Sequence, residues 1–177
     1  MVSYRDLTSL GADDGIGCAI IMSMVQGLAP HGPLRVILTV DEEDGLTGIM
    51  NLDPAVAADL KYLVNVDYES SDAVCVSSAG GVEIDITCDG ENGMAPEGDL
   101  PLTEEVYREQ NGSEINVDTV HATLECGTFA VMNPSLDMVS IGPDLVDVHS
   151  TSEMLYLRTI PKTFNLLAGI LDGIAAA

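Results

Sequence analysis

Apolar runs alternate with short polar, glycine-containing segments along most of this chain. The first long run, 16–28, is apolar nearly all round, which is typical of a helix packed against a sheet. The next run, Leu34–Val40, is rich in β-branched residues and ends just before an acidic turn that closes at Gly45. This pattern predicts a buried strand followed by a turn.

The same patterns predict the remaining elements. We expect strands at Tyr62–Val66, Ala73–Ser77, Val82–Cys88, Ile115–His121 and Met138–Ile141, and helices at Leu46–Leu52, Leu102–Gln110, Leu124–Met132 and Ile160–Ile174. Strands that alternate with helices predict an α/β fold with three αβα layers and a mostly parallel mixed sheet. The length of 177 residues predicts a single domain, 1–177, with a linker or junction at 89–98, where glycines and acids gather.

Acidic residues outnumber basic ones by 29 to 6, which gives a net charge of −23. This balance argues against nucleic acid and anionic membranes as partners. It fits a cation-binding protein, and equally a surface adapted to high salt. The four cysteines form no CxxC pair and nothing resembles a signal peptide, so we expect reduced thiols and a cytoplasmic protein. The longest apolar stretch is too short to cross a bilayer.

Four consecutive carboxylates, Asp41–Asp44, follow the predicted strand Leu34–Val40 without a linker. Ligands of α/β proteins usually bind beyond the carboxyl ends of parallel strands. Because neighbouring carboxylates repel each other, a cation is expected here, and a metal ion is the simplest one. The alternative interpretation is a solvated acidic turn.

Three further sites share this setting: Asp13 precedes the first helix, Asp67 follows the strand Tyr62–Val66, and His149 lies in a late loop. Each has an ordinary explanation when taken alone, since Asp13 fits a helix cap, Asp67 a turn former and His149 a surface histidine. Together with Glu42 and Glu43 they form carboxylates plus one imidazole, a ligand set that suits zinc, manganese or cobalt better than calcium.

The segments that carry these residues resemble a known family. "LGADDGIG", "LTVDEEDGLTG", "LVNVDYE", "SSAGG", "HATLECGTF" and "SIGPDLVDVHSTSE" occur in the order found in the M20 metallopeptidases, and they are most similar to the aminoacyl-histidine dipeptidase branch (PepD-like, cytosolic non-specific dipeptidases). The resemblance extends from about residue 10 to 174. It implies a zinc-peptidase-like catalytic domain that hydrolyses dipeptides, with Xaa-His among the candidate substrates.

The resemblance also implies a role for each residue. Asp13 would bridge two metal ions, Glu43 and His149 would complete one site, and Asp67 would belong to the other. Glu42 would be the general base that takes a proton from the metal-activated water. Since Glu42 and Glu43 are adjacent, their side chains are expected to point in different directions from the strand end.

The chain departs from the family pattern in two places. The family has a His-x-Asp motif upstream of the bridging aspartate, and no histidine precedes Asp13 here, so the second metal site is expected to be incomplete. The inserted lid and dimerisation domain is also absent, and its junction is expected at 89–98. His31 and His121 are not expected to replace these losses, although His121 stands near a strand end from which it could approach the site. Asp14 occupies a position where related sequences often have asparagine.

Three functional hypotheses remain open. The first is an M20-type metallo-dipeptidase core with at least one metal ion and a dipeptide substrate. The second is a truncated or engineered core that folds and binds a metal without turnover. The third, an acidic cation-binding or interaction protein, requires the order of the motifs to be accidental. Loss of the first strands would leave a sheet edge uncovered, so self-association as a homo-oligomer, or contact with a partner, is expected to cover it.

Overall fold

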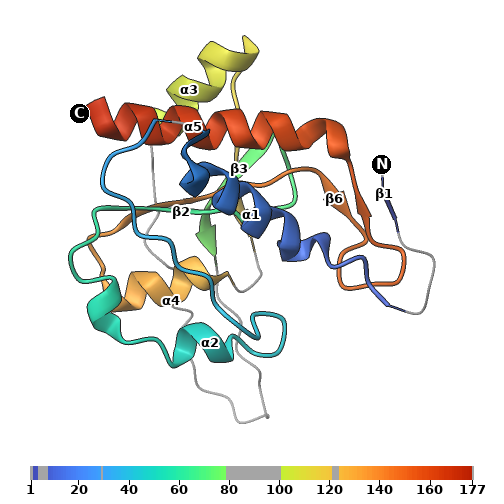
Figure 1. The fold of residues 1–177 in the computed structure, drawn as a ribbon, viewed down its shortest axis with the longest axis horizontal. Coiled ribbons are helices and arrows are strands. Elements are labelled where there is room, and N and C mark those ends of the chain that lie inside the picture. The colour runs from blue at the N-terminus through green and yellow to red at the C-terminus, as the bar shows by residue number, and fades with distance from the viewer. Residues whose placement is uncertain (1, 4–7, 29, 79–100, 121–123, 177) are drawn as a thin grey trace.

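A four-stranded mixed sheet forms the centre of the computed structural model, which describes residues 2–3, 8–28, 30–78, 101–120 and 124–176 (Figure 1). Its strands are β2 (Tyr62–Asn65), β3 (Ala73–Ser78), β4 (Asn116–Val120) and β5 (Asp137–Ser140), in the order β2-β5-β3-β4. β2 is parallel to β5 and β3 is parallel to β4, while β3 and β5 are antiparallel. β2 is therefore the edge strand nearest the functional residues.

Helices cover both faces of this sheet, so the predicted three-layer α/β fold is confirmed (Figure 1). α1 (Ala12–Ser23) and α5 (Ile160–Ala176) cover one face with α3 (Pro101–Asn111) packed on α5, and α2 (Thr47–Met50) and α4 (Glu125–Met132) cover the other. Neighbouring strand residues alternate between the two cores: Val139 packs with α1 and α5, whereas Met138 packs with α4. Among the described helices, none is long and apolar enough to cross a membrane.

A second, smaller antiparallel sheet holds the late loop in place. It pairs β1 (Val2–Ser3), β7 (Met154–Leu155) and β6 (Leu145–Val146) in that order. Short helical turns lie at Met24–Leu28, Pro54–Val56 and Leu157–Thr159. The sequence pattern did not predict this sheet, because its two-residue strands are too short to show a period. Its importance is that the turn between β6 and β7 carries His149.

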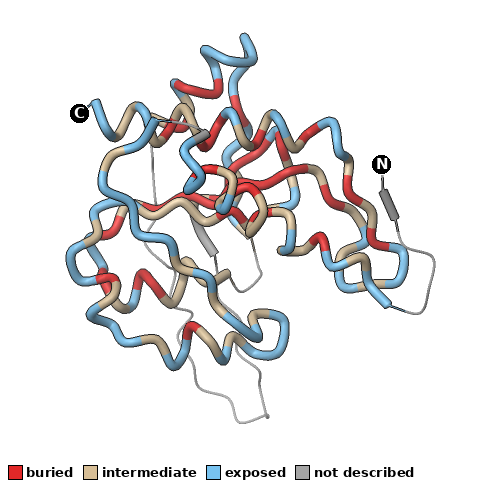
Figure 2. The backbone as a smooth tube through the Cα atoms, viewed as in Figure 1, coloured by how far each residue is buried: buried red, intermediate tan, exposed pale blue. Residues whose placement is uncertain are grey.

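Most predicted elements are confirmed to within a few residues, but the strand at Leu34–Val40 is wrong. This segment is extended, yet it joins neither sheet, and most of its residues are exposed (Figure 2). Among the described residues no backbone hydrogen bond reaches positions 34–39. A strand needs a partner as well as an apolar pattern, and no described strand forms hydrogen bonds with this segment. The predicted strand Val82–Cys88 and the junction 89–98 lie outside the described residues.

Candidate metal centre

The structure brings together three residues that are far apart in the sequence. The Nε2 atom of His149 lies 3.0 Å from Oδ2 of Asp13 and 2.8 Å from Oε2 of Glu43. One ligand atom from each side chain falls within 4.8 Å of the other two. The Asp13 side chain is 11% exposed and that of His149 is 66% exposed, so the carboxylate lies on the buried side of the cluster and the imidazole lies on its open side. An open side is what a catalytic metal needs in order to accept water or substrate.

Asp13 is held by a buried carboxylate that the sequence analysis did not identify. Glu153 is 1% exposed, and its two carboxylate oxygens accept hydrogen bonds from the backbone N–H groups of Gly11, Ala12 and Asp13 at 2.8–3.0 Å. Burial raises the pKa of Glu153, but the backbone donors lower it further, and the net pKa lies below the usual range. Glu153 is therefore an ionised anchor for the start of α1, and it sets where the Asp13 side chain can lie.

Tight backbone geometry positions the other two side chains. Glu43 lies in a turn in which Leu46 donates its N–H to the Glu42 carbonyl at 3.1 Å and Gly48 donates to the Val40 carbonyl at 3.1 Å. A Cβ at position 48 would overlap the Val40 backbone, so glycine is required for this approach. His149 has a positive φ of 59° in the turn between β6 and β7. Both side chains are thus aimed by turns and not by a regular strand.

A second group of carboxylates lies next to the first. Asp14, Glu42, Asp67 and Glu125 line one cavity between α1, β2 and α4. Burial, reinforced by the neighbouring carboxylates, raises the pKa of Asp14 to about 8 and that of Asp67 to about 9. Burial and the charge of Glu43 also raise the pKa of Glu42. Oε1 of Glu125 is buried and has no hydrogen-bond partner within the described part of the chain.

Among the described residues no lysine or arginine forms an ion pair with these carboxylates. The lysine and arginine ion pairs are Arg35–Asp59, Arg108–Glu114 and Lys162–Asp72; the first lies at the opposite end of the same cavity and the other two lie elsewhere. The nitrogen donor of the site is the exposed imidazole of His149. Several oxygen ligands and one nitrogen ligand, with no cation of the protein's own in the described ranges, form a ligand set that suits a divalent transition metal such as zinc, manganese or cobalt.

The sequence-predicted residues thus fall into two adjacent places. Asp13, Glu43 and His149 form one cluster, and Asp67 approaches Asp13 from the other side, where a side-chain hydrogen bond with Asp13 contributes to its raised pKa. Glu42 faces the cavity that Asp14 and Asp67 also line, so it points away from its neighbour Glu43.

Three other predictions concern residues near this site. Asp14 is the residue that caps α1, because its Oδ1 accepts the Gly17 N–H at 3.0 Å. His31 lies away from the site, in a turn whose Gly32 packs on Ala175 at the end of α5. His121 lies outside the described residues. Glu153 was missed because its partners are backbone groups about 140 residues away, which leave no pattern in the sequence.

Known proteins are similar to this chain in sequence and in fold. No family model matches it. Over 87 residues, 48% of the chain, it is 34% identical to the cytosol non-specific dipeptidase of Escherichia coli (strain K12). The chain is thus similar in sequence to a dipeptidase over about half of its length. The matched part is 18% of the length of that dipeptidase, so the similarity covers less than a fifth of that protein.

Two solved structures share the fold of this chain over nearly its whole length. The aminopeptidase PepT from Bacillus cereus ATCC 10987 superposes with a TM-score of 0.73 at 17% identity, over 96% of this chain and 73% of that one. The aminopeptidase APDkam598 from the archaeon Desulfurococcus kamchatkensis superposes with a TM-score of 0.65 at 18% identity, over 92% of this chain and 48% of that one. At this identity the likeness concerns the fold alone.

Proposed function

We propose that this chain is the core of a metal-dependent dipeptidase. The convergence of Asp13, Glu43 and His149 on one point carries the proposal, since these residues come from three distant segments and their ligand atoms lie within 4.8 Å of one another. The sequence similarity to a dipeptidase supports the reaction class. The name of that relative also supports the predicted cytoplasmic localisation.

The residues divide the work of peptide hydrolysis between two positions. Asp13, Glu43 and His149 would hold a zinc, manganese or cobalt ion, which when bound supplies a Lewis acid and an activated water. Glu42 would take the proton from the attacking water and pass it to the leaving amine. Its carboxyl is half-buried beside other acids, and the resulting raised pKa favours its holding a proton between these steps. Asp67, beside Asp13, would serve a second ion.

A non-catalytic metal-binding core is the second candidate. It is favoured by the composition of the Asp67 side of the site, where the described residues contribute carboxylates but no histidine. A complete second position is expected to need a nitrogen ligand or a further donor from outside the described residues. In this case one ion would bind at Asp13, Glu43 and His149 without turnover.

Metal binding and turnover separate these two functions. Zn²⁺, Mn²⁺ and Co²⁺ would be titrated into the metal-stripped chain by calorimetry, and release of free amino acids would be followed from Xaa-His and Xaa-Ala dipeptides. We expect Glu42→Gln to keep metal affinity and to lose about 10²–10⁴-fold in kcat. We expect His149→Ala to lose at least about 100-fold in metal affinity, because it removes a direct ligand.

The matched control is Glu105→Gln, which makes the same change on the exposed face of α3 and should alter neither quantity. If the wild type binds metal but shows the same background rate as Glu42→Gln, the chain is the non-catalytic core. If none of the three metals binds at micromolar concentration, both functions fail.

A further inference from the structure

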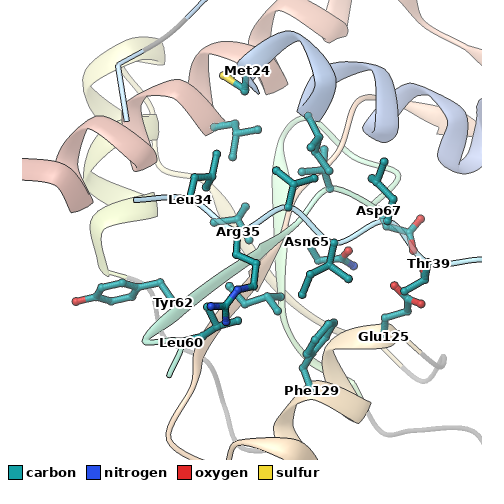
Figure 3. Close-up of a pocket in the computed structure, with 18 of the residues that line it drawn as sticks. Met24, Leu34, Arg35, Thr39, Leu60, Tyr62, Asn65, Asp67, Glu125 and Phe129 are labelled. Carbon is teal, nitrogen blue, oxygen red and sulfur yellow. The ribbon is translucent and has the colours of Figure 1, made fainter. Parts of the chain in front are cut away.

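A cavity of about 1010 Å³ separates the extended segment 33–39 from the edge strand β2 (Figure 3). Its upper wall comes from α1, from the helical turn Met24–Leu28 and from α5, with the apolar residues Ile21, Met24 and Leu171 among the lining residues. Its lower wall comes from α4, where Phe129 faces the space. The cavity therefore continues the plane of the central sheet between its two helical layers.

Each long wall of this cavity is extended backbone that presents an edge without a hydrogen-bonded partner among the described residues. Positions 34–39 form no backbone hydrogen bond with any other described residue. β2 is bonded to β5 on one side, and its other edge faces the cavity. Backbone N–H and C=O groups in an apolar setting are costly to leave unpaired, and an open strand edge is a template for another strand. The walls thus favour a ligand that supplies backbone hydrogen bonds on both sides.

The two walls run in the same direction. Arg35 bonds to Asp59, just before β2, at the beginning of the segment, whereas Glu42 lies in the field of Asp67 just after β2. An inserted strand that is parallel to both neighbours would therefore have its carboxyl end at the acidic end of the cavity. Because helices cover both faces there, its side chains would be apolar on both faces.

We propose that this cavity is a docking site for an extended polypeptide segment that does not belong to these 177 residues. The segment enters as a parallel β-strand between residues 34–39 and β2, with an apolar body and a basic residue at its carboxyl end. Asp14, Asp67 and Glu125 lie at that end of the cavity without a basic partner among the described residues, so a cationic terminus complements them (Figure 3). A second copy of this chain fits less well, because each copy has a net charge of −23.

Hydrogen exchange on the full chain tests this proposal, in EDTA so that the outcome does not depend on metal binding. The probe is the capped hexapeptide Ac-Val-Thr-Val-Ile-Val-Arg-NH₂, and the control peptide has proline in place of isoleucine, which removes a backbone donor. We expect the probe to slow exchange at least tenfold at amides within 34–39 and 62–65, and to leave the amides of α3 unchanged. The proline peptide should give no protection.

Two exposed apolar residues provide matched variants. Leu38 lines the cavity and is 52% exposed, whereas Val131 lies on the outer face of α4 and is 82% exposed. Because both are exposed, an aspartate at either position should leave the fold intact. Leu38→Asp should weaken the binding of the probe at least tenfold, and Val131→Asp should have no effect.

Several results would overturn the proposal. Amides of 34–39 and of the β2 edge that are already protected in the free chain would show that these segments pair with each other. Protection that grows with protein concentration and needs no peptide would assign the site to a second copy. Equal binding of the proline peptide would reduce the site to an apolar cavity, and no protection at millimolar probe would mean that no strand docks.

Discussion

Two acidic clusters in this molecule have opposite electrostatics. At Asp72 one carboxylate accepts hydrogen bonds from the Tyr107 hydroxyl at 2.9 Å and from the Lys162 ammonium, and these two donors hold the pKa of Asp72 below its usual value. At the metal centre, burial and mutual repulsion raise the pKa of Asp14 and Asp67 far above the usual value. The negative charge of an aspartate is thus compensated by a neighbouring ammonium in the balanced cluster at Asp72, whereas Asp14 and Asp67, in the unbalanced cluster, have no such cation beside them among the described residues.

This difference separates an arrangement with a structural explanation from one for which we propose metal binding. The hydrogen bonds of the Asp72 cluster join α3 and α5 to the end of the sheet, and the ammonium of Lys162 compensates the negative charge of Asp72. The other cluster is built so that several carboxylates face one another, which costs stability until a cation arrives. An acidic site that is expensive when empty and stabilised when filled is what a metal-binding function requires.

The largest expected effect is the dependence of stability on pH in the metal-free chain. The carboxyls of Asp14 and Asp67 stay protonated in the folded state up to about pH 8 and 9, whereas in the unfolded chain they titrate near their ordinary value of 3.8. Between these limits the unfolded chain binds fewer protons, so rising pH favours unfolding. We expect Tm to fall by roughly 5–10 °C between pH 5 and pH 9, which corresponds to a few kcal/mol for a domain of this size.

Two variants sharpen this comparison by calorimetric melting. Asp14→Asn should flatten the decline because it removes one of the two buried acids. Asp72→Asn should instead lower Tm by a similar amount throughout pH 5–9 and leave the slope unchanged, since the stability that comes from the lowered pKa of Asp72 is fully present above about pH 4. Saturating Zn²⁺ should raise Tm more at pH 7.5 than at pH 6, because the ion binds the deprotonated carboxylates. A wild-type Tm that is constant between pH 5 and pH 9 would contradict the unbalanced cluster.

The next effect concerns Glu153, which holds the unbalanced cluster in place. Glu153→Gln keeps the size of the side chain but removes the negative charge that faces the N–H groups of Gly11, Ala12 and Asp13. We expect a loss of about 1–3 kcal/mol in the free energy of unfolding, measured by urea denaturation. We also expect a 10–100-fold loss in metal affinity through displacement of Asp13. Unchanged metal affinity in a destabilised variant would limit Glu153 to a structural role.

The sequence predicted the features that depend on the spacing of apolar residues or on the order of motifs along the chain. The stripe of the last helix was expected to be buried at Leu166, Leu167, Ile170, Leu171 and Ile174. The first three residues are buried, whereas Leu171 and Ile174 are half-buried. The strand at Leu34–Val40 was wrong because an apolar pattern reports a tendency to be buried, while a strand also depends on a neighbour to which it can bond. Glu153 was missed for a related reason: its function depends on backbone groups that any residue type supplies.

The convergence of the site followed from topology more than from any single residue. Asp67 was expected near the other acids because it follows a strand, and β2 does end beside Asp13. The position of His149 depends on a two-residue strand pair, β6 and β7, that carries no recognisable period. Only the order of the motifs linked this histidine to the carboxylates before the structure did.

The smallest expected effect lies in the balanced cluster and isolates the two regions from each other. Lys162→Met keeps the length of the side chain and its packing over the Tyr107 ring, where the ammonium lies 4.7 Å from the ring centroid, but removes the charge. Because Asp72 is largely exposed, we expect a loss of about 1 kcal/mol or less in the free energy of unfolding, and a rise in the pKa of Asp72 that NMR titration would detect. Metal affinity should stay within twofold of the wild type, since the three ligands belong to other segments. A larger loss of metal affinity would show that α5 transmits the state of one cluster to the other, and the separation between a balanced and an unbalanced region would no longer hold.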